Sequence, residues 1–428
     1  PYHPRPYELA AKVFMEHQEE KEALDIIAQA EKVSAMTDEL RLIKLRCLRL
    51  LAKEKKDYDL ALEYAKNVLD TPDPDRTPQW IAQLKRVMAL CYLESGQHVQ
   101  ALETISESVK ENPSDDSSRI VKARILECTG QESQALCMYL DLVSHLPDNA
   151  FLTERIGQIY ARRKDWKKSV FYIKKALALE PDYPRIHFTL GHLYREIAEE
   201  GNNSYWEKAL KHLDQAVLRD NTVECHMERG DAYYNKGDYA SACEDFRWIL
   251  AREPENQEAM LSMAYACLCM KAYETAVQWF EKCLNFFADS DLYPGICART
   301  GQCYERMGDL QKALYYYDLG LEKRPQYDKL YMHKGVMLLR QKAYEKAAGV
   351  FQAGIEHCPE KKEVFADKLC IAWLLLGQRK NARQWWKLLM IDRELHWRFI
   401  GGLRAGQYAL YIERKPAKAR RCFEKAVH

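Results

Sequence analysis

Cysteine and histidine, the residue types that most often bind metals, are numerous in this sequence but are not grouped. There are 14 Cys and 12 His among 428 residues. A structural zinc site needs thiolates or imidazoles in close pairs, with about two to four residues between the members of a pair. Cys267 and Cys269 are two positions apart and Cys297 and Cys303 are six apart, so neither pair fits. We therefore predict no metal site and interpret the cysteines as buried, reduced thiols.

The sequence also lacks the short patterns that carry catalytic chemistry. It has no Gly-rich phosphate loop, no pair of helical histidines around a glutamate and no nucleophile-elbow pattern. His187 and His192 are five positions apart, which places them on different faces of a helix. We predict no cofactor and no enzymatic activity for this chain.

A regular series of small residues points instead to the elements of the fold. At one register it runs through Ala23, Ala61, Ala101, Ala135, Ser169, Ala209, Ala242, Ala276, Ala313, Ala347, Ala382 and Ala419. The successive spacings range from 33 to 40 residues, and 34 is the most frequent value. Self-similarity at such a period is typical of helical-repeat proteins. Twelve marks predict about twelve units of two helices each.

Other positions recur in the same register. Gly157 is a small residue of a first helix, Tyr160 follows it as a large residue, and Pro181 closes the unit. Turn glycines are expected at Gly96, Gly130, Gly237, Gly308 and Gly377. Small residues let two helices approach, Gly can take the left-handed conformation that ends a helix, and Pro cannot continue one. One helix pair cannot bury its apolar face alone, so the units must stack.

These positions resemble the tetratricopeptide repeat family from about Pro6 to Val427, most closely between Asp148 and Pro359. The resemblance implies an all-α fold, a right-handed superhelical solenoid of about twelve antiparallel helix pairs. Arg49 stands where a small residue is expected, so we predict atypical repeats in residues 1–70.

Residues 71–428 are predicted to form the main superhelix, with an irregular end at about 387–428 that contains Gly401 and Gly402. We expect one continuous solenoid. The start without Met and the end without a polar capping helix suggest a fragment of a longer chain.

The resemblance also implies which side chains line the concave surface, at five set positions of each first helix. These positions predict a basic patch beside an apolar and aromatic strip. The predicted partner-binding residues are Arg162, Arg185, Phe188, His192, Arg195, Met227, Asp231, Tyr234, Leu261 and Tyr265. Arginine and aromatic residues dominate binding hot spots, and such a groove suits a peptide with an acidic element.

An alternative gives these arginines no binding role, because Glu154, Glu196 and Glu224 are available to neutralise them. The family's carboxylate clamp for the acidic tails of heat-shock chaperones needs Lys and Asn at positions where this chain has Glu154, Gln158 and Thr189. That class of partner is therefore not expected.

Two further clusters leave their roles open. A basic cluster, which would suit phosphate or RNA or form a solvated face, comprises Arg41, Lys44, Arg46, Arg49, Lys53, Lys55 and Lys56. A cluster of Trp373, Trp385, Trp386 and Trp397 near the C-terminus would pack an irregular end or dock another subunit.

Overall composition limits the class of partner. With 64 basic and 63 acidic residues the formal net charge is +1, so no global field favours nucleic acid or membrane. No apolar run approaches the length of a membrane span, and the N-terminal residues lack the apolar segment of a signal peptide. We predict a cytoplasmic protein, with the nucleus as the alternative.

The leading hypothesis is a non-catalytic scaffold that binds a partner protein or peptide in its groove, as a subunit or module of a larger complex. Single-stranded RNA binding is one alternative, favoured less because the predicted lining mixes Glu and Arg. A substrate-recruiting domain of a larger enzyme is the other.

Overall fold

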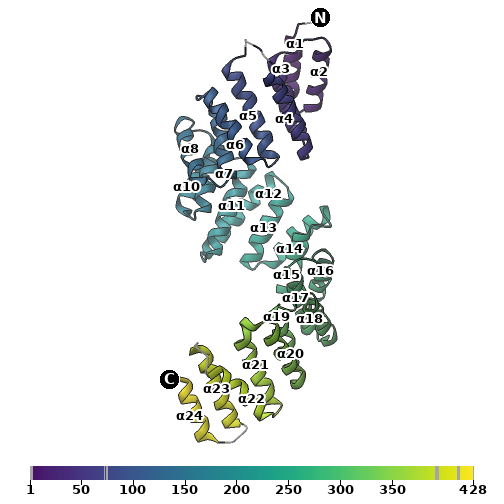
Figure 1. Ribbon diagram of the computed structural model, residues 1–428, viewed down its shortest axis with the longest axis vertical. Helices are drawn as coiled ribbons and strands as arrows, with labels where there is room; N and C mark the ends of the chain where they lie inside the picture. Colours follow the sequence, from purple (N-terminus) through teal and green to yellow (C-terminus); the bar gives the residue numbers. More distant parts are fainter. Residues whose placement is uncertain (1–2, 72, 74–75, 391–394, 412–414, 428) are drawn as a thin grey trace. The chain divides into compact units, whose positions relative to one another are not determined.

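The protein is built from consecutive helices. The computed structural model describes residues 3–71, 73, 76–390, 395–411 and 415–427, which form 24 α-helices, two short 3-10 helices and no strand (Figure 1). The chain divides into two compact units, Pro1–Ile197 and Ala198–His428, called here the first and second unit. The predicted all-α class and the twelve helix pairs are confirmed.

The first unit contains five complete helix pairs and most of α11. Its helices are α1 (Arg5–Glu16), α2 (Glu20–Lys32), α3 (Asp38–Leu51), α4 (Lys55–Asp70), α5 (Pro78–Glu94), α6 (His98–Glu111), α7 (Asp116–Cys128), α8 (Glu132–His145), α9 (Ala150–Arg162), α10 (Trp166–Leu179) and α11 (Pro184–Glu199). Odd-numbered helices are the first members of their pairs and even-numbered helices the second.

The second unit continues in the same order. After η1 (Asn203–Tyr205) come α12 (Trp206–Arg219), α13 (Val223–Lys236), α14 (Tyr239–Arg252), α15 (Gln257–Cys269), α16 (Tyr273–Phe286), α17 (Tyr293–Met307), α18 (Leu310–Lys323), α19 (Asp328–Arg340), α20 (Tyr344–His357), η2 (Pro359–Lys361), α21 (Lys362–Leu375), α22 (Arg379–Met390), α23 (Leu395–Tyr411) and α24 (Pro416–Val427).

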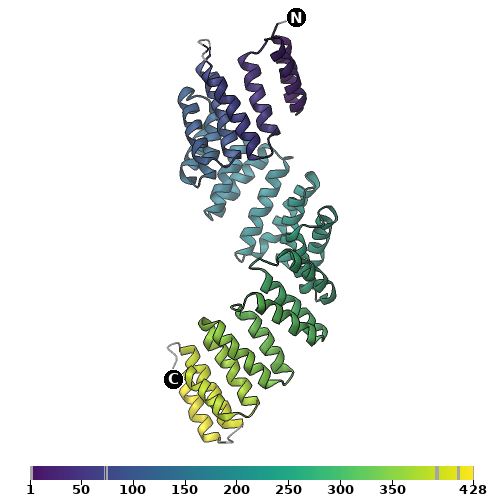
Figure 2. The same cartoon turned by 45° about the vertical axis from the view of Figure 1, so that its right-hand side comes forward.

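The small residues of the register are points of close helix approach. A methyl group on Gly230 of α13 would lie 2.7 Å from the ring of Phe246 on α14. Gly335 of α19 faces Phe351 of α20 in the same way. Within each unit neighbouring helices therefore lie side by side, as Figure 2 shows.

Turn chemistry and caps fix where the helices begin and end. The five predicted turn glycines all have positive φ, between 75° and 94°. Gly237 ends α13 in the left-handed conformation, which costs glycine little because it has no Cβ. At the next pair, Asn256 begins α15 by accepting a hydrogen bond from the backbone N–H of Ala259.

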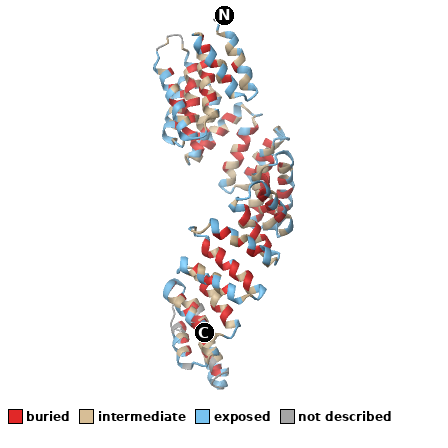
Figure 3. Ribbon diagram, turned by 90° about the vertical axis from the view of Figure 1, so that its right-hand side faces the viewer, coloured by how far each residue is buried: buried red, intermediate tan, exposed pale blue. Residues whose placement is uncertain are grey.

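Buried positions follow the sides along which helices meet (Figure 3). The largest fully buried side chains include Tyr139 in the first unit and Tyr317, Phe246 and Phe351 in the second. Each repeat thus shares its core with its neighbours, as stacked helix pairs must.

Candidate binding surface on the first helices

The predicted partner-binding residues lie on first helices of both units. Arg162 belongs to α9, and Arg185, Phe188, His192 and Arg195 belong to α11, all within the first unit. The remaining five residues lie on α13 and α15 of the second unit. We call the predicted set of first-helix positions the inner wall and describe it unit by unit.

Three of the predicted residues line one hollow of the first unit, called here the histidine pocket. Its volume is about 240 Å³. It is lined by Gln158, Ala161, Arg162, Ile173, Phe188, Thr189, His192, Leu193 and Glu196. Nε2 of His192 lies 3.8 Å from the carboxylate of Glu196. Nδ1 of the same histidine lies 3.3 Å from the guanidinium of Arg195. Phe188 therefore shares this hollow with a guanidinium and an imidazole, and Arg195 adds a second guanidinium beside the imidazole.

Arg185 lines a second, larger hollow of about 580 Å³, called here the arginine pocket. It is lined by Arg124, Cys128, Ala150, Phe151, Glu154, Arg155, Glu180, Tyr183, Arg185 and Ile186. These residues come from α7, α9 and α11 and from the segment before α11. Three successive first helices thus contribute one arginine each.

Hydrogen bonds link residues that line the two pockets, because Glu154 lines the arginine pocket and Gln158 and Thr189 line the histidine pocket. Glu154 is buried and accepts hydrogen bonds from the Thr189 hydroxyl at 2.8 Å and from the Gln158 amide at 2.9 Å. Its carboxylate also lies 3.6 Å from Nε of Arg185. Because its acceptors are already used within the wall, this charge is well satisfied.

A second buried carboxylate, Glu127 of α7, binds two arginines. It lies 2.7 Å from Arg155 and 2.6 Å from Arg162, and the Tyr139 hydroxyl donates to it at 3.2 Å. Burial lowers the pKa of Arg155, but the hydrogen bond to Glu127, the charge of Glu127 and the nearby Tyr139 together outweigh burial, so the pKa lies above its ordinary value. Arg162 also pairs with Glu132.

The alternative in which Glu154, Glu196 and Glu224 neutralise the predicted arginines is therefore correct only in part. Arg185 contacts Glu154, as that alternative requires, and His192 contacts Glu196. The partners of Arg162 are instead Glu127 and Glu132 of the preceding repeat. That repeat was not included in the sequence argument, which is why these partners were missed.

In the second unit the predicted strip is half-buried. Met227, Tyr234, Leu261 and Tyr265 pack against the largest hydrophobic core of the unit. The Tyr234 hydroxyl lies 3.6 Å from the sulfur of Cys269, one repeat further on. Asp231 of α13 is also half-buried. The strip is thus a partly exposed edge of the core.

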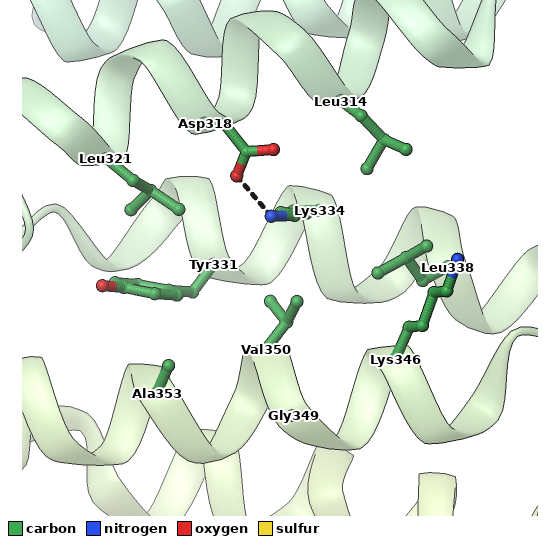
Figure 4. A pocket seen from close by; sticks show the side chains of 10 residues that line it. All are labelled: Leu314, Asp318, Leu321, Tyr331, Lys334, Leu338, Lys346, Gly349, Val350 and Ala353. Atoms are coloured by element: carbon green, nitrogen blue, oxygen red, sulfur yellow. Dashed lines mark hydrogen bonds and ion pairs between the residues drawn. The ribbon is translucent and has the colours of Figure 1, made fainter.

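Another hollow of the second unit lies away from the inner wall. It has a volume of about 550 Å³ and is formed by α18, α19 and α20. Figure 4 shows that Lys334 and Asp318 form an ion pair across it, while Gly349 contributes no side chain. Two of its three helices are second helices, so it belongs to another face of the unit.

Sequence reasoning missed Arg124 and Arg155 of the arginine pocket. Arg124 stands in α7 at the position that the predicted residue His192 occupies in α11, but the register was not applied to the repeat of α7. Extending the register by one repeat would have found it. Arg155 occupies a position that is not part of the inner-wall set, so the pattern alone gave no signal for it.

Three of the seven residues of the basic cluster form ion pairs, and Lys53, Lys55 and Lys56 are exposed. Arg41 contacts Asp38 at 2.5 Å, Lys44 contacts Glu31 at 2.7 Å and Arg49 contacts Glu94 at 2.6 Å. This arrangement favours the solvated-face interpretation of the cluster.

The described part of the tryptophan cluster serves packing. Trp386 belongs to a small core with Cys370 and Ala382, and Trp373 and Trp385 pack against it. The side chain of Trp397 lies outside the described residues.

Among the described residues, no three Cys, His, Asp or Glu side chains are grouped to hold a metal ion. Over the same part of the chain, no helix combines the length and apolar character that a bilayer crossing requires.

Comparisons with known proteins agree with the repeat pattern. A family model described as tetratricopeptide repeat matches residues 227–292 and 299–361. Human Protein O-mannosyl-transferase TMTC1 is 25% identical over 181 residues, which cover 41% of this chain and 20% of that protein. BBSome complex member BBS4 of Bos taurus is 21% identical over 284 residues, which cover 65% of this chain and 52% of that protein.

Among solved structures, a tetratricopeptide repeat protein from Parabacteroides merdae ATCC 43184 is similar with a TM-score of 0.42 and 14% identity. The match covers 60% of this chain and 98% of that one. The chain spans between a fifth and about half of the length of the two curated relatives named above.

Proposed function

Because the chain belongs to the tetratricopeptide repeat superfamily, we propose that it is a non-catalytic scaffold whose first unit binds a partner protein or peptide along its inner wall. Proteins of this superfamily typically serve as interaction scaffolds, and one relative is named as the member of a complex. A role as one subunit of an assembly is part of the proposal.

The observation that carries the proposal is the pair of neighbouring pockets on α7, α9 and α11. The histidine pocket offers Phe188 as an apolar anchor beside Arg162 and His192. The arginine pocket continues the wall with cationic groups. An apolar anchor next to guanidiniums is the composition of interface hot spots, and it matches a peptide with apolar and acidic residues.

A second candidate function is suggested by one relative. The human transferase TMTC1 is similar over only 20% of its length, so this chain would correspond to a repeat segment that recruits a substrate to an enzyme. The same inner wall would then bind the substrate protein. The scaffold and the substrate-recruiting segment would differ in the protein parts to which this chain is joined. Both would use the same binding surface, which the next experiment tests.

Site-specific photo-crosslinking tests the proposed surface. Phe188 of α11 or, as a matched control, the exposed Phe171 of α10 is replaced by benzoylphenylalanine, and crosslinked proteins are identified by mass spectrometry. We expect one defined partner to crosslink from position 188 and not from position 171. Equal crosslinking from both positions, or crosslinking from position 171 alone, would refute binding at the inner wall.

A further inference from the structure

Two cations of the arginine pocket are poorly neutralised. Over the described residues, the Arg124 side chain makes no hydrogen bond, ion pair or ring contact. Arg185 is 62% exposed, and its one ion-pair contact within the same residues is the 3.6 Å approach to Glu154. Each of these two guanidinium groups brings a positive charge and several N–H donors to the pocket.

The carboxylates nearby are occupied or peripheral. Glu154 already accepts hydrogen bonds from Thr189 and Gln158, and the buried Glu127 is paired with Arg155 and Arg162. Glu180 is exposed at the end of α10. The pocket therefore keeps an excess of positive charge that these carboxylates do not cancel.

Aromatic surface flanks the two arginines. Phe151 is 43% exposed and Tyr183 is 45% exposed, although both line a hollow of about 580 Å³. Exposed aromatic rings beside guanidiniums suit a ligand that brings an anionic group and apolar atoms together. Such a ligand is larger than a single inorganic ion.

We propose that the arginine pocket receives a phosphorylated serine or threonine of the bound partner, with the phosphate between Arg124 and Arg185 and a neighbouring apolar side chain against Phe151 and Tyr183. This inference rests on the proposed function. A phosphate group carries about −1.5 to −2 charges at pH 7, which matches two guanidiniums. Its three oxygens also accept the forked hydrogen bonds of arginine, whereas a carboxylate supplies one charge and two oxygens.

Degenerate peptide libraries test this assignment. Three fluorescent libraries share random flanks and differ only in a central phosphoserine, serine or glutamate. Binding to the whole chain is measured by fluorescence polarisation. We expect the phosphoserine library to bind roughly tenfold more tightly than the serine library, because one or more charge-assisted hydrogen bonds form.

Arginine variants assign the effect to the pocket. Arg124→Ala and Arg185→Ala should each remove most of the preference for phosphoserine, and Arg124→Lys should keep part of it. Arg163→Ala, which removes an exposed arginine outside the pocket that donates to Ser133 at 3.0 Å, should leave the preference unchanged. Circular dichroism melting curves establish that each variant is folded before it is compared.

Three results would overturn the inference. The first is equal binding of the phosphoserine and serine libraries, and the second is equal binding of the glutamate and phosphoserine libraries. The third is a mixed-sequence single-stranded RNA that binds more tightly than any peptide through the same arginines. Failure here leaves the proposed function intact if a partner still crosslinks from position 188, so the two failures are distinguishable.

Discussion

At the scale of single residues, two glycines on the neighbouring helices α19 and α20 allow the effect of side-chain packing on stability to be measured apart from the effect of helix propensity. Gly335 of α19 has Phe351 against its open side, and an added Cβ would lie 2.5 Å from the Cζ atom of that fully buried ring. At Gly349 of α20 an added Cβ would meet nothing within 4 Å beyond its chain neighbours and the backbone of its own helix. Gly335→Ala should destabilise the protein by about 1–3 kcal/mol through overpacking.

Gly349→Ala should stabilise the protein by about 0.5–1 kcal/mol, because alanine loses less backbone entropy in a helix. Denaturant unfolding of both variants measures the difference. Equal destabilisation by the two substitutions would show that close helix approach is not what selects Gly335.

The buried carboxylate Glu127 gives a second prediction at this scale. Its side chain is only 4% exposed and pairs with Arg155 and Arg162. Arg155→Ala should destabilise the protein by about 1–3 kcal/mol, because part of a buried charge loses its partner. Arg119→Ala, which removes a partly exposed arginine paired with the partly exposed Asp116 and Asp141, should cost about 1 kcal/mol or less. A larger loss for Arg119→Ala than for Arg155→Ala would contradict this account.

Sequence reasoning found the residues that define architecture and missed partners that cross between repeats. Gly230 and Gly335 were predictable, because each occupies in its own first helix the small-residue position that Gly157 occupies in α9. The pairing of Arg162 with Glu127 joins residues 35 positions apart in different repeats. A periodic pattern predicts the face of the helix on which a side chain lies, but it does not predict which of several nearby carboxylates that side chain binds.

At the scale of elements, a polar cluster joins α12, α13 and α14. Buried Asp245 of α14 lies 2.6 Å from Nδ1 of His226 and 2.6 Å from Arg229, both on α13. Arg229 also pairs with Asp214 of α12 at 2.9 Å. The His226 ring stacks on Trp248 with 3.6 Å between ring centroids.

This cluster makes stability depend on pH. Burial lowers the pKa of His226 below its ordinary value of 6.5, although the hydrogen bond to Asp245 acts in the opposite direction. Just below pH 6.5 the unfolded chain therefore binds more protons at this residue than the folded chain does. This contribution to stability should be complete above pH 6.5 and should decrease as the pH falls below that value.

The slope of unfolding free energy against pH measures the effect. Just below pH 6.5 this slope should be smaller for the His226→Gln variant than for the wild type. His145→Gln, which changes an exposed histidine of the first unit, is the matched control. An unchanged slope in His226→Gln would contradict the assignment.

Element order was predictable from the register, and some departures from it were predictable as well. The spacing between Ser169 and Ala209 is 40 residues, at the long end of the series, and the structure places the short helix η1 in this repeat, between α11 and α12. Hydrogen bonds such as that from the Thr189 hydroxyl to Glu154 were not predictable, because they depend on how neighbouring first helices align.

At the scale of the whole molecule, the repeat pattern predicts a chain of equivalent helix pairs, and the structure groups them into two units. The boundary between Ile197 and Ala198 lies in the last turn of α11, shortly before η1. Both pockets of the proposed surface lie in the first unit. The candidate site is thus a local property of α7 to α11, and its lining was only partly predictable from the register.

The most direct test of the account is the dissociation constant for the partner identified by crosslinking, measured with purified proteins. The double variant Arg185→Glu with Phe188→Ala changes the inner wall. Its control, Lys174→Glu with Phe171→Ala, makes equivalent changes on exposed residues of α10. If each of the two inner-wall residues is a hot spot of about 2 kcal/mol, affinity should fall roughly several hundredfold in the first variant and hardly change in the second. Equal affinity of the two variants would contradict the proposed binding surface.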